Sequence, residues 1–281
     1  MFMRQYDILQ KFIFESADIR GEFVHLHHCI KALVERHPYP QPVLNLLSQA
    51  LSAVALLSGT IKFEGALILQ TETNGAINVL VAQSNEKQHI RGLAKWDEAR
   101  LEEGCLLGEG RLAITIIPDN AKDKRYQGIV EISDDNFTLA FETYFMQSEQ
   151  LATKLWLASD GHRAAGLLLQ KMPSDNSDWA YWEHVSTLAA TISDQELLNL
   201  DNTEILHRLF HEEDIRLFDE SPAVFKCRCT KEKMEKAILT CGEAEIETLL
   251  IINPVIDVTC EFCNQQYSFD KVDVARIFAT S

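Results

Sequence analysis

Four of the seven cysteines in this 281-residue chain fall in two closely spaced pairs near its C-terminus. Cys227 and Cys229 form a Cys-x-Cys pair, and Cys260 and Cys263 form a Cys-x-x-Cys pair some thirty residues later. Two such pairs joined by a loop can supply four thiolates to one tetrahedral zinc ion. Because four protein ligands leave no open position for a substrate, the pattern predicts a structural zinc site rather than a catalytic one.

The same four cysteines could also take part in redox chemistry. Thiolates react with peroxide and hypochlorous acid, and each pair could close a local disulfide. Both bridges together would use up all four ligands and expel the zinc, and a strained Cys-x-Cys ring is easily reduced. Four basic residues surround the first pair: Lys226, Arg228, Lys231 and Lys233. They either favour the thiolate form or are ordinary solvated charges, so the spacing supports a zinc site and is compatible with an oxidation switch.

The other three cysteines are single and are not counted as ligands. Cys29 ends the segment 25–29, His-Leu-His-His-Cys, where a helix face with partly exposed imidazoles is favoured over a metal site. Cys105 adjoins two leucines and is expected to be buried. Cys241 lies between the two pairs and could become a stray disulfide partner under stress. No spacing of serine, histidine or carboxylate residues singles out a catalytic site.

Composition and charge narrow the class of protein. The formal net charge of −16 repels phosphate backbones and anionic lipid, so we expect neither a nucleic acid nor a membrane as partner. The longest apolar block, 43–58, contains polar residues and is shorter than the roughly 20 apolar residues that span a bilayer. The N-terminus also lacks a signal-peptide pattern. These features favour the cytosol, where paired cysteines usually bind metal or carry out redox chemistry.

Residues 1–173 are predicted to form an α+β core that begins with helices. The segment 5–36 is interpreted as helical pieces joined near Gly21. The proline-rich segment 37–42 then breaks the chain, because proline cannot continue a helix. A helix resumes over 43–58, and its apolar residues cover most of the circumference, which predicts a buried core helix.

Hairpins dominate the rest of this core. Short β-rich runs occur at 61–63, 66–71, 77–82, 110–117 and 128–132. Thr73-Asn74-Gly75 is a hairpin turn signal, and Gly108-Glu-Gly110 is interpreted as a turn because it lacks the ending of a phosphate loop. An amphipathic helix is expected from Phe137, after the turn at 134–136, and another hairpin over 155–169. Helices mixed with antiparallel hairpins are typical of the α+β class.

Residues 174–224 are predicted to form a helical linker. A polar stretch, 174–178, precedes a region expected to be helical from Trp179 to Phe218. Ser193 and Glu196 have the spacing of a capping box, in which each side chain satisfies a backbone donor of the first turn. The region is acidic and amphipathic. It is either a set of helices packed on their own domain or a segment that can detach.

Residues 225–281 are predicted to form a small zinc domain. Thr230 is expected to cap a helix ending at Leu239, and a second helix covers 243–251. A strand at 256–258 leads to Cys260, and Asp270 caps a closing helix over 272–278. A domain of this size buries little apolar surface, whereas zinc binding to such sites contributes about 10–16 kcal/mol. We therefore expect the domain to unfold when the metal is removed.

Several motifs along the chain resemble those of one known family. Segment 225–233, FKCRCTKEK, resembles its Cys-x-Cys-Ser/Thr-x-Glu-Arg/Lys element, and 258–264, VTCEFCN, followed by YSFD at 267–270, resembles its Cys-x-x-Cys element. Upstream, segments 57–63, 126–130 and 144–150 are similar to its core motifs. The similarity covers essentially the whole chain. By this resemblance the chain is identified as a member of the thirty-three-kilodalton heat-shock protein family, the redox-regulated holdase chaperones of the bacterial cytosol.

The resemblance implies a specific cycle rather than an enzymatic activity. When reduced, Cys227, Cys229, Cys260 and Cys263 would hold one zinc ion per chain, and the protein would be inactive. Oxidation would form Cys227–Cys229 and Cys260–Cys263, release zinc, unfold the zinc domain and destabilise the linker. The protein would then dimerise and bind unfolding or oxidatively damaged clients without ATP, in a response to heat and oxidative stress. Cys241 is not part of the family pattern. It affects only whether each disulfide forms between its expected partners.

Paired cysteines also occur in three other classes of protein. The first is a thiol–disulfide oxidoreductase that uses Cys260 and Cys263, but no thioredoxin-like βαβ pattern surrounds this pair, and the second cysteine pair would be unexplained. The second is a nucleic-acid-binding zinc ribbon, which the net charge opposes. A zinc deaminase fits less well still, because Thr259 rather than proline precedes Cys260 and the only His-x-Glu sequence, at 211–213, lies in the linker.

Overall fold

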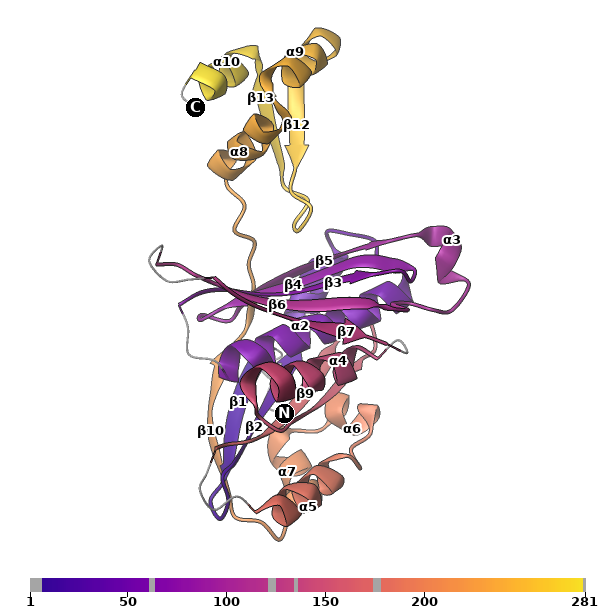
Figure 1. Cartoon of the computed structure of the whole chain (residues 1–281), viewed down its shortest axis with the longest axis vertical. Coiled ribbons are helices and arrows are strands. Elements are labelled where there is room, and N and C mark those ends of the chain that lie inside the picture. The colour runs from indigo at the N-terminus through magenta and orange to yellow at the C-terminus, as the bar shows by residue number, and fades with distance from the viewer. Residues whose placement is uncertain (1–6, 61–63, 121–124, 134–135, 174–177, 280–281) are drawn as a thin grey trace, which may run out of the picture. The chain divides into compact units, whose positions relative to one another are not determined.

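The computed structural model of the chain describes residues 7–60, 64–120, 125–133, 136–173 and 178–279. The chain divides into two compact units, Met1–Lys226 and Cys227–Ser281 (Figure 1). Helices and strands are mixed in both units, which confirms the predicted α+β class. Each unit has its own hydrophobic core, so each is described by itself.

The N-terminal unit is organised around one long helix, α2 (Gln41–Thr60), which packs between two sheets (Figure 1). Pro42 lies in its first turn, where a missing backbone N–H is tolerated. The helix is apolar and long enough to span a membrane, yet most of its side chains are buried inside the protein. The sequence prediction of a buried core helix is therefore confirmed.

The first sheet has five strands in the order β10-β1-β2-β9-β8. Its members are β1 (Ile8–Phe14), β2 (Ile19–Leu26), β8 (Thr153–Ser159), β9 (Ala164–Lys171) and β10 (Ile215–Pro222), and all neighbouring pairs are antiparallel. Every residue of β9 is buried. One face of the sheet packs on α2, and the other is covered by three helices of the predicted linker. The expected hairpin over 155–169 is confirmed.

The predicted helices over 5–36 are wrong for most of the segment, because β1 and β2 occupy it and only α1 (His28–Val34) is helical. Gly21 lies in the middle of β2, directly opposite Phe12 of β1. A Cβ at Gly21 would overlap the Phe12 ring, so this glycine makes room for an aromatic side chain and does not join helices. Both strands are largely buried, and short apolar runs of this kind cannot be told from buried helix by periodicity alone.

The second sheet has six strands in the order β11-β5-β4-β3-β6-β7. They are β3 (Gly65–Thr73), β4 (Ile77–Asn85), β5 (His89–Trp96), β6 (Gly110–Pro118), β7 (Tyr126–Ile132) and β11 (Val224–Phe225). Antiparallel pairing of β3 with β4 confirms the turn predicted at 73–75. The sequence interpretation missed β5, and the run expected at 61–63 lies outside the described residues. A short helix, α3 (Glu98–Leu101), follows β5.

The amphipathic helix expected from Phe137 is α4 (Phe137–Tyr144), which continues as a π-helix, η1 (Phe145–Glu149). Asn136 caps α4 by accepting a hydrogen bond from the backbone N–H of Leu139 at 2.9 Å. The preceding residues of the predicted turn, 134–135, lie outside the described chain. Helix α4 packs against β7 and β8, and its buried aromatic residues join the core around α2.

Three helices follow the hairpin of β8 and β9: α5 (Trp179–Ala189), α6 (Asp194–Asn199) and α7 (Asn202–Phe210). The capping box of Ser193 and Glu196 is present at the start of α6, as predicted. The prediction that helix continues to Phe218 is wrong, because β10 begins at Ile215 and pairs with β1. Ile215 and Leu217 are half-buried while Arg216 and Phe218 are exposed, and this alternation is the signature of a strand.

The C-terminal unit contains α8 (Lys231–Cys241), α9 (Glu243–Ile252), β12 (Val255–Thr259), β13 (Gln266–Asp270) and α10 (Lys271–Ala279). Thr230 and Asp270 cap α8 and α10, as predicted. The sequence interpretation did not identify β13, which pairs with β12. Among the described residues of this unit, the buried hydrophobic core is small and consists of Ile238, Ile246, Phe269, Val274 and Ile277.

Candidate metal centre

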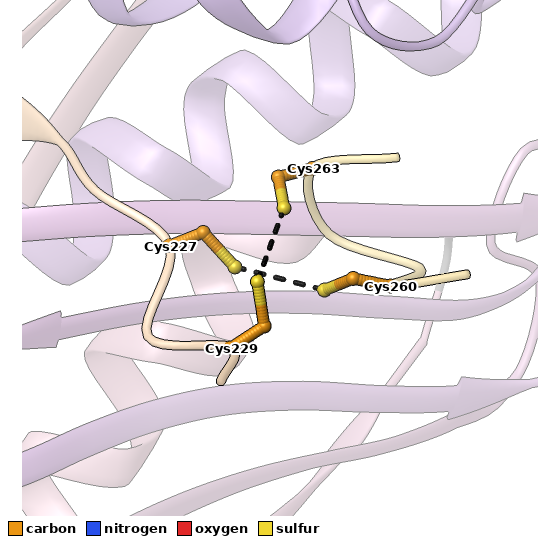
Figure 2. A group of neighbouring side chains, drawn as sticks. All are labelled: Cys227, Cys229, Cys260 and Cys263. Carbon is orange, nitrogen blue, oxygen red and sulfur yellow. Dashed lines mark hydrogen bonds between the residues drawn. The ribbon is translucent and has the colours of Figure 1, made fainter. Parts of the chain in front are cut away.

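The structure brings the four predicted ligands together at one end of the C-terminal unit. Cys227 and Cys229 lie in the extended segment before α8, and Cys260 and Cys263 lie in the turn between β12 and β13 (Figure 2). The turn is closed by two backbone hydrogen bonds of 2.9 Å, from Asn264 N–H to Cys260 O and from Cys260 N–H to Gln265 O. Asn264 has a φ of +61°, a left-handed conformation that asparagine tolerates well. The turn therefore points both of its sulfurs toward the first pair.

The spacing of the four sulfur atoms fits a tetrahedral ion. All four lie within 4.8 Å of one another. The Sγ atoms of Cys227 and Cys260 are 3.6 Å apart, and those of Cys229 and Cys263 are 3.5 Å apart. Zinc–sulfur bonds of about 2.3 Å in a tetrahedron place sulfurs about 3.8 Å apart. The four cysteines are present as thiols, so the donor set and its geometry match a four-thiolate metal site.

Burial disfavours the charged thiolate form of two of the four cysteines, Cys260 and Cys263. Burial raises the pKa of the Cys260 thiol, although the backbone N–H groups of Phe262 and Cys263 oppose this effect. Burial also raises the pKa of Cys263. Thiols with raised pKa values stay protonated when no cation is bound, and metal binding to such a site displaces their protons. Cys260 and Cys263 are thus poor acids that a divalent cation would convert to thiolates.

Two of the basic residues near the first pair have other partners. The Nζ atom of Lys231 lies 3.4 Å from a carboxylate oxygen of Asp273. Lys233 donates a hydrogen bond of 2.6 Å to the backbone carbonyl of Arg228. Both lysines therefore interact with oxygen atoms nearby. This favours the interpretation that they are ordinary surface charges over the interpretation that they stabilise the thiolates.

The remaining cysteines lie outside this cluster. Cys29 is fully buried in the first turn of α1. The expected helix face of imidazoles is wrong in part, because His25 lies in β2 and His27 precedes α1. Cys105 is exposed, which corrects the expectation that it is buried. Its neighbour Leu107 reaches the core, but apolar neighbours do not determine where a side chain points in a loop.

Cys241 ends α8 as an exposed thiol, and its Sγ atom lies 3.5 Å from the carbonyl of Ala237. Among the described residues, the group that could hold a metal consists of Cys227, Cys229, Cys260 and Cys263. Sequence spacing had identified these four. It did not identify Tyr267, whose hydroxyl lies 3.3 Å from the Sγ atom of Cys229. This hydrogen bond raises the pKa of Tyr267 to about 12. Segment 267–270 resembles a family motif, but that resemblance does not indicate a contact with Cys229.

The fold and the site together define a class of protein: an α+β unit with a helix between two sheets, followed by a small unit built on four clustered thiols. Comparison with known families identifies the class. The model of the family described as Hsp33 protein matches residues 7–270, and the chain belongs to this family.

Relatives with high similarity carry the name 33 kDa chaperonin. The protein of Pseudomonas syringae pv. syringae is 45% identical, over 97% of this chain and 94% of its own length. The protein of Nitrosococcus oceani is 44% identical, over 98% of this chain and 96% of its own length. A crystal structure of the 33 kDa chaperonin (heat shock protein 33 homolog) from Thermotoga maritima has a TM-score of 0.85 at 19% identity, covers 98% of this chain and 99% of its own, and shows the same fold. The chain is therefore a chaperone of the heat-shock type.

Proposed function

We propose that this chaperone is an ATP-independent holdase controlled by the oxidation of its four-cysteine cluster. In the reduced state, Cys227, Cys229, Cys260 and Cys263 hold one zinc ion, and the protein does not bind clients. Oxidation forms Cys227–Cys229 and Cys260–Cys263, releases the zinc and activates the protein. The observation that carries this proposal is the geometry of the cluster, in which four sulfurs from two short loops lie within 4.8 Å of one another.

The zinc site can act as a switch because little else stabilises the folded state of the C-terminal unit. In the part of the unit that the structure describes, the buried core consists of five side chains from α8, α9, β13 and α10. Structural zinc contributes about 10–16 kcal/mol to the folding of small domains, whereas a core of this size contributes only a few. Loss of the four ligands therefore unfolds the unit, including the segment that begins at Cys227.

The oxidation step needs an oxidant of the peroxide class. The two thiols of each pair lose two electrons and two protons in total to one molecule of hydrogen peroxide, which is reduced to two molecules of water while one sulfur–sulfur bond forms. Two molecules of peroxide convert the four thiols to two disulfides. Because thiolate sulfur is the metal ligand, the bridged cysteines no longer hold zinc.

The surface offered to clients is the apolar face of the five-stranded sheet that the linker helices cover. Phe12, Phe14 and Phe23 of this face are buried beneath α5–α7. Phe14 packs edge-to-face against Phe210 of α7, with ring centroids 5.2 Å apart. When the linker helices detach, this aromatic cluster is exposed to solvent. Apolar surface of this kind binds the exposed apolar segments of unfolding proteins without any nucleotide.

The linker is joined covalently to the switch. Residues 211–226 connect the end of α7 to Cys227, and they contain β10, the edge strand of the five-stranded sheet. We propose the domain division inferred from the sequence, with a core at 1–173, a linker at 174–224 and a zinc domain at 225–281. We also propose that the active form is a homodimer and that the protein works in the cytosol on unfolded or oxidatively damaged proteins.

The proposal is tested by measuring zinc and chaperone activity on the same samples. Reduced protein is expected to hold one zinc per chain and to leave the aggregation of a heat-labile enzyme unchanged. Peroxide with mild heat is expected to release the zinc and to suppress aggregation, measured by light scattering. Zinc retained after oxidation, or equal suppression by the reduced protein, would contradict the proposal.

Paired substitutions sharpen this test. Cys227→Ser with Cys229→Ser, and Cys260→Ser with Cys263→Ser, should each abolish zinc binding. Cys105→Ser is the matched control, because Cys105 is an exposed cysteine outside the cluster, and it should leave zinc content and oxidative activation unchanged. An insulin-reduction assay separates the holdase from a thiol–disulfide oxidoreductase. No turnover is expected, because Cys260 and Cys263 lie in a β-hairpin turn rather than in a βαβ unit.

A further inference from the structure

Tyr267 connects the core of the C-terminal unit to the sulfur cluster. It lies in β13 opposite Val258 of β12, and its half-buried ring packs against the small hydrophobic core of the unit. From this position its hydroxyl donates a hydrogen bond of 3.3 Å to the Sγ atom of Cys229. Because strand pairing and ring packing both hold the side chain, the direction of the hydroxyl is set by the fold of the hairpin.

We propose that Tyr267 is a positioning residue that holds Cys229 in the metal site and lowers the reactivity of its sulfur. A donor outside the ligand set orients a metal ligand and offsets part of its negative charge. A lone pair engaged by a hydroxyl is also less available to attack an electrophile. Tyr267 therefore retards the chemistry that would remove Cys229 from the site. The inference rests on the proposed four-cysteine zinc site, and it adds Tyr267 as a residue that regulates the reactivity of that site.

The same strand provides a matched control. Ser268 follows Tyr267 directly, and its hydroxyl donates to a carboxylate oxygen of Asp257 at 2.6 Å. Successive residues of a strand point to opposite faces, so the hydroxyls of Tyr267 and Ser268 lie on opposite faces of the hairpin. Tyr267→Phe and Ser268→Ala each remove one hydroxyl from β13, but only the first removes a hydrogen bond to a ligand sulfur. Both variants keep the strand pairing of β12 and β13.

The first measurement is zinc affinity, determined by competition between the full-length reduced protein and a chromogenic zinc chelator. Loss of a partner outside the ligand set typically lowers metal affinity 10–100-fold, so Tyr267→Phe should bind zinc about tenfold more weakly, whereas Ser268→Ala should match the wild type. Tyr267→Leu removes the ring as well. If only ring packing matters, Tyr267→Phe will equal the wild type and Tyr267→Leu alone will lose affinity, which would overturn the proposal.

The second measurement is the reactivity of each sulfur in zinc-loaded protein. Iodoacetamide alkylates a cysteine when its sulfur attacks the carbon and iodide leaves, and peptide mass spectrometry reports each site separately. In Tyr267→Phe the alkylation rate of Cys229 should rise several-fold relative to that of Cys260. An equal rise at all four cysteines would show a general loosening of the unit and would refute the positioning role.

The two proposals fail in different ways. If the four cysteines do not form a zinc site, the wild-type protein itself will hold no zinc. If the zinc site exists but Tyr267 does not position Cys229, the wild type and Tyr267→Phe will hold zinc equally and will be alkylated at Cys229 at the same rate.

Discussion

The Sγ atoms of Cys227 and Cys260 lie 3.6 Å apart, so sulfurs from two different pairs are in contact. The same holds for Cys229 and Cys263, at 3.5 Å. The folded cluster therefore does not by itself favour disulfides within each pair over disulfides between pairs. Which bridges form depends on whether the unit is folded when the second sulfur reacts.

We predict that bridges within each pair dominate when oxidation is accompanied by unfolding. Closing a short loop costs less chain entropy than closing one of about thirty residues, so an unfolding chain should yield Cys227–Cys229 and Cys260–Cys263. Peptide mass spectrometry after peroxide treatment at elevated temperature will map them. Cys241→Ser serves as the control for stray pairing, because Cys241 is exposed. A majority of Cys227–Cys260 bridges under these conditions would contradict the prediction.

Asn202 is predicted to hold the linker helices on the core. This buried residue at the start of α7 accepts a hydrogen bond from Nε2 of His25 at 2.7 Å and donates one to Oε1 of Gln10 at 2.7 Å. Gln10 in turn donates to the carbonyl of Phe218 in β10 at 2.9 Å. The chain of bonds thus joins α7, β2, β1 and β10.

Asn202→Ala removes the central member of this chain. Loss of a partner from a buried polar group costs about 1–3 kcal/mol, so amide hydrogen exchange in α5–α7 should accelerate in the reduced protein. The neighbouring exposed residue provides the control, since Thr203→Ala changes the same helix turn without touching the chain of bonds. Unchanged exchange in Asn202→Ala would show that the apolar contacts of the helices suffice to hold them.

Gly21 is predicted to be essential for the packing of the aromatic face. The Phe12 ring lies over Gly21 and stacks on Phe23, with ring centroids 5.2 Å apart. Gly21→Ala places a methyl group where the Phe12 ring lies, and such overpacking costs about 1–3 kcal/mol. Urea denaturation of the reduced protein should show this loss.

The control for Gly21→Ala is Gly104→Asn. Gly104 has no atoms near the position that a Cβ would take, and its φ of +81° is tolerated by asparagine. This variant should change the free energy of unfolding by less than about 0.5 kcal/mol. Equal stability of the two variants would mean that the Phe12 ring can move aside at no cost.

Glu22 is predicted to make the stability of the N-terminal unit depend on pH. Its side chain is buried at the end of α2, and burial raises its pKa to about 8, although the nearby cations of Lys11 and Arg20 oppose this shift. A carboxyl whose pKa is raised in the folded state contributes stability that is fully present below the unfolded pKa of about 4.5. This contribution is lost as the pH rises through about 8.

Glu22→Gln should therefore flatten this dependence, because glutamine resembles the protonated carboxyl. Above pH 8 the variant should be more stable than the wild type by more than about 1 kcal/mol, since each pKa unit corresponds to about 1.4 kcal/mol. Urea denaturation at pH 5.5 and pH 8.5 measures the difference. Glu131→Gln changes an exposed carboxylate and should show no such effect. A constant difference between Glu22→Gln and the wild type at both pH values would refute the prediction.

The parts of this protein that sequence alone could predict depend on local patterns. The spacing of Cys227 and Cys229, and of Cys260 and Cys263, predicts a cluster of four thiols that could hold a metal ion, because each pair occupies one short bend. The capping box of Ser193 and Glu196 and the caps at Thr230 and Asp270 were also predictable, since a helix cap needs only residues within one turn. The apolar pattern of α2 identified a buried core helix for the same reason.

Tertiary structure decided the features that depend on residues far apart in the chain. The segment 8–26 forms strands because β2 pairs with β9, some 140 residues away, and β10 is a strand because β1 provides its partner. Cys105 is exposed, and Tyr267 reaches Cys229, because the path of the backbone sets where each side chain points. Local propensity and spacing carry no information about such distant partners. The sequence by itself therefore determined which atoms could bind the metal, and the fold decided what surrounds them.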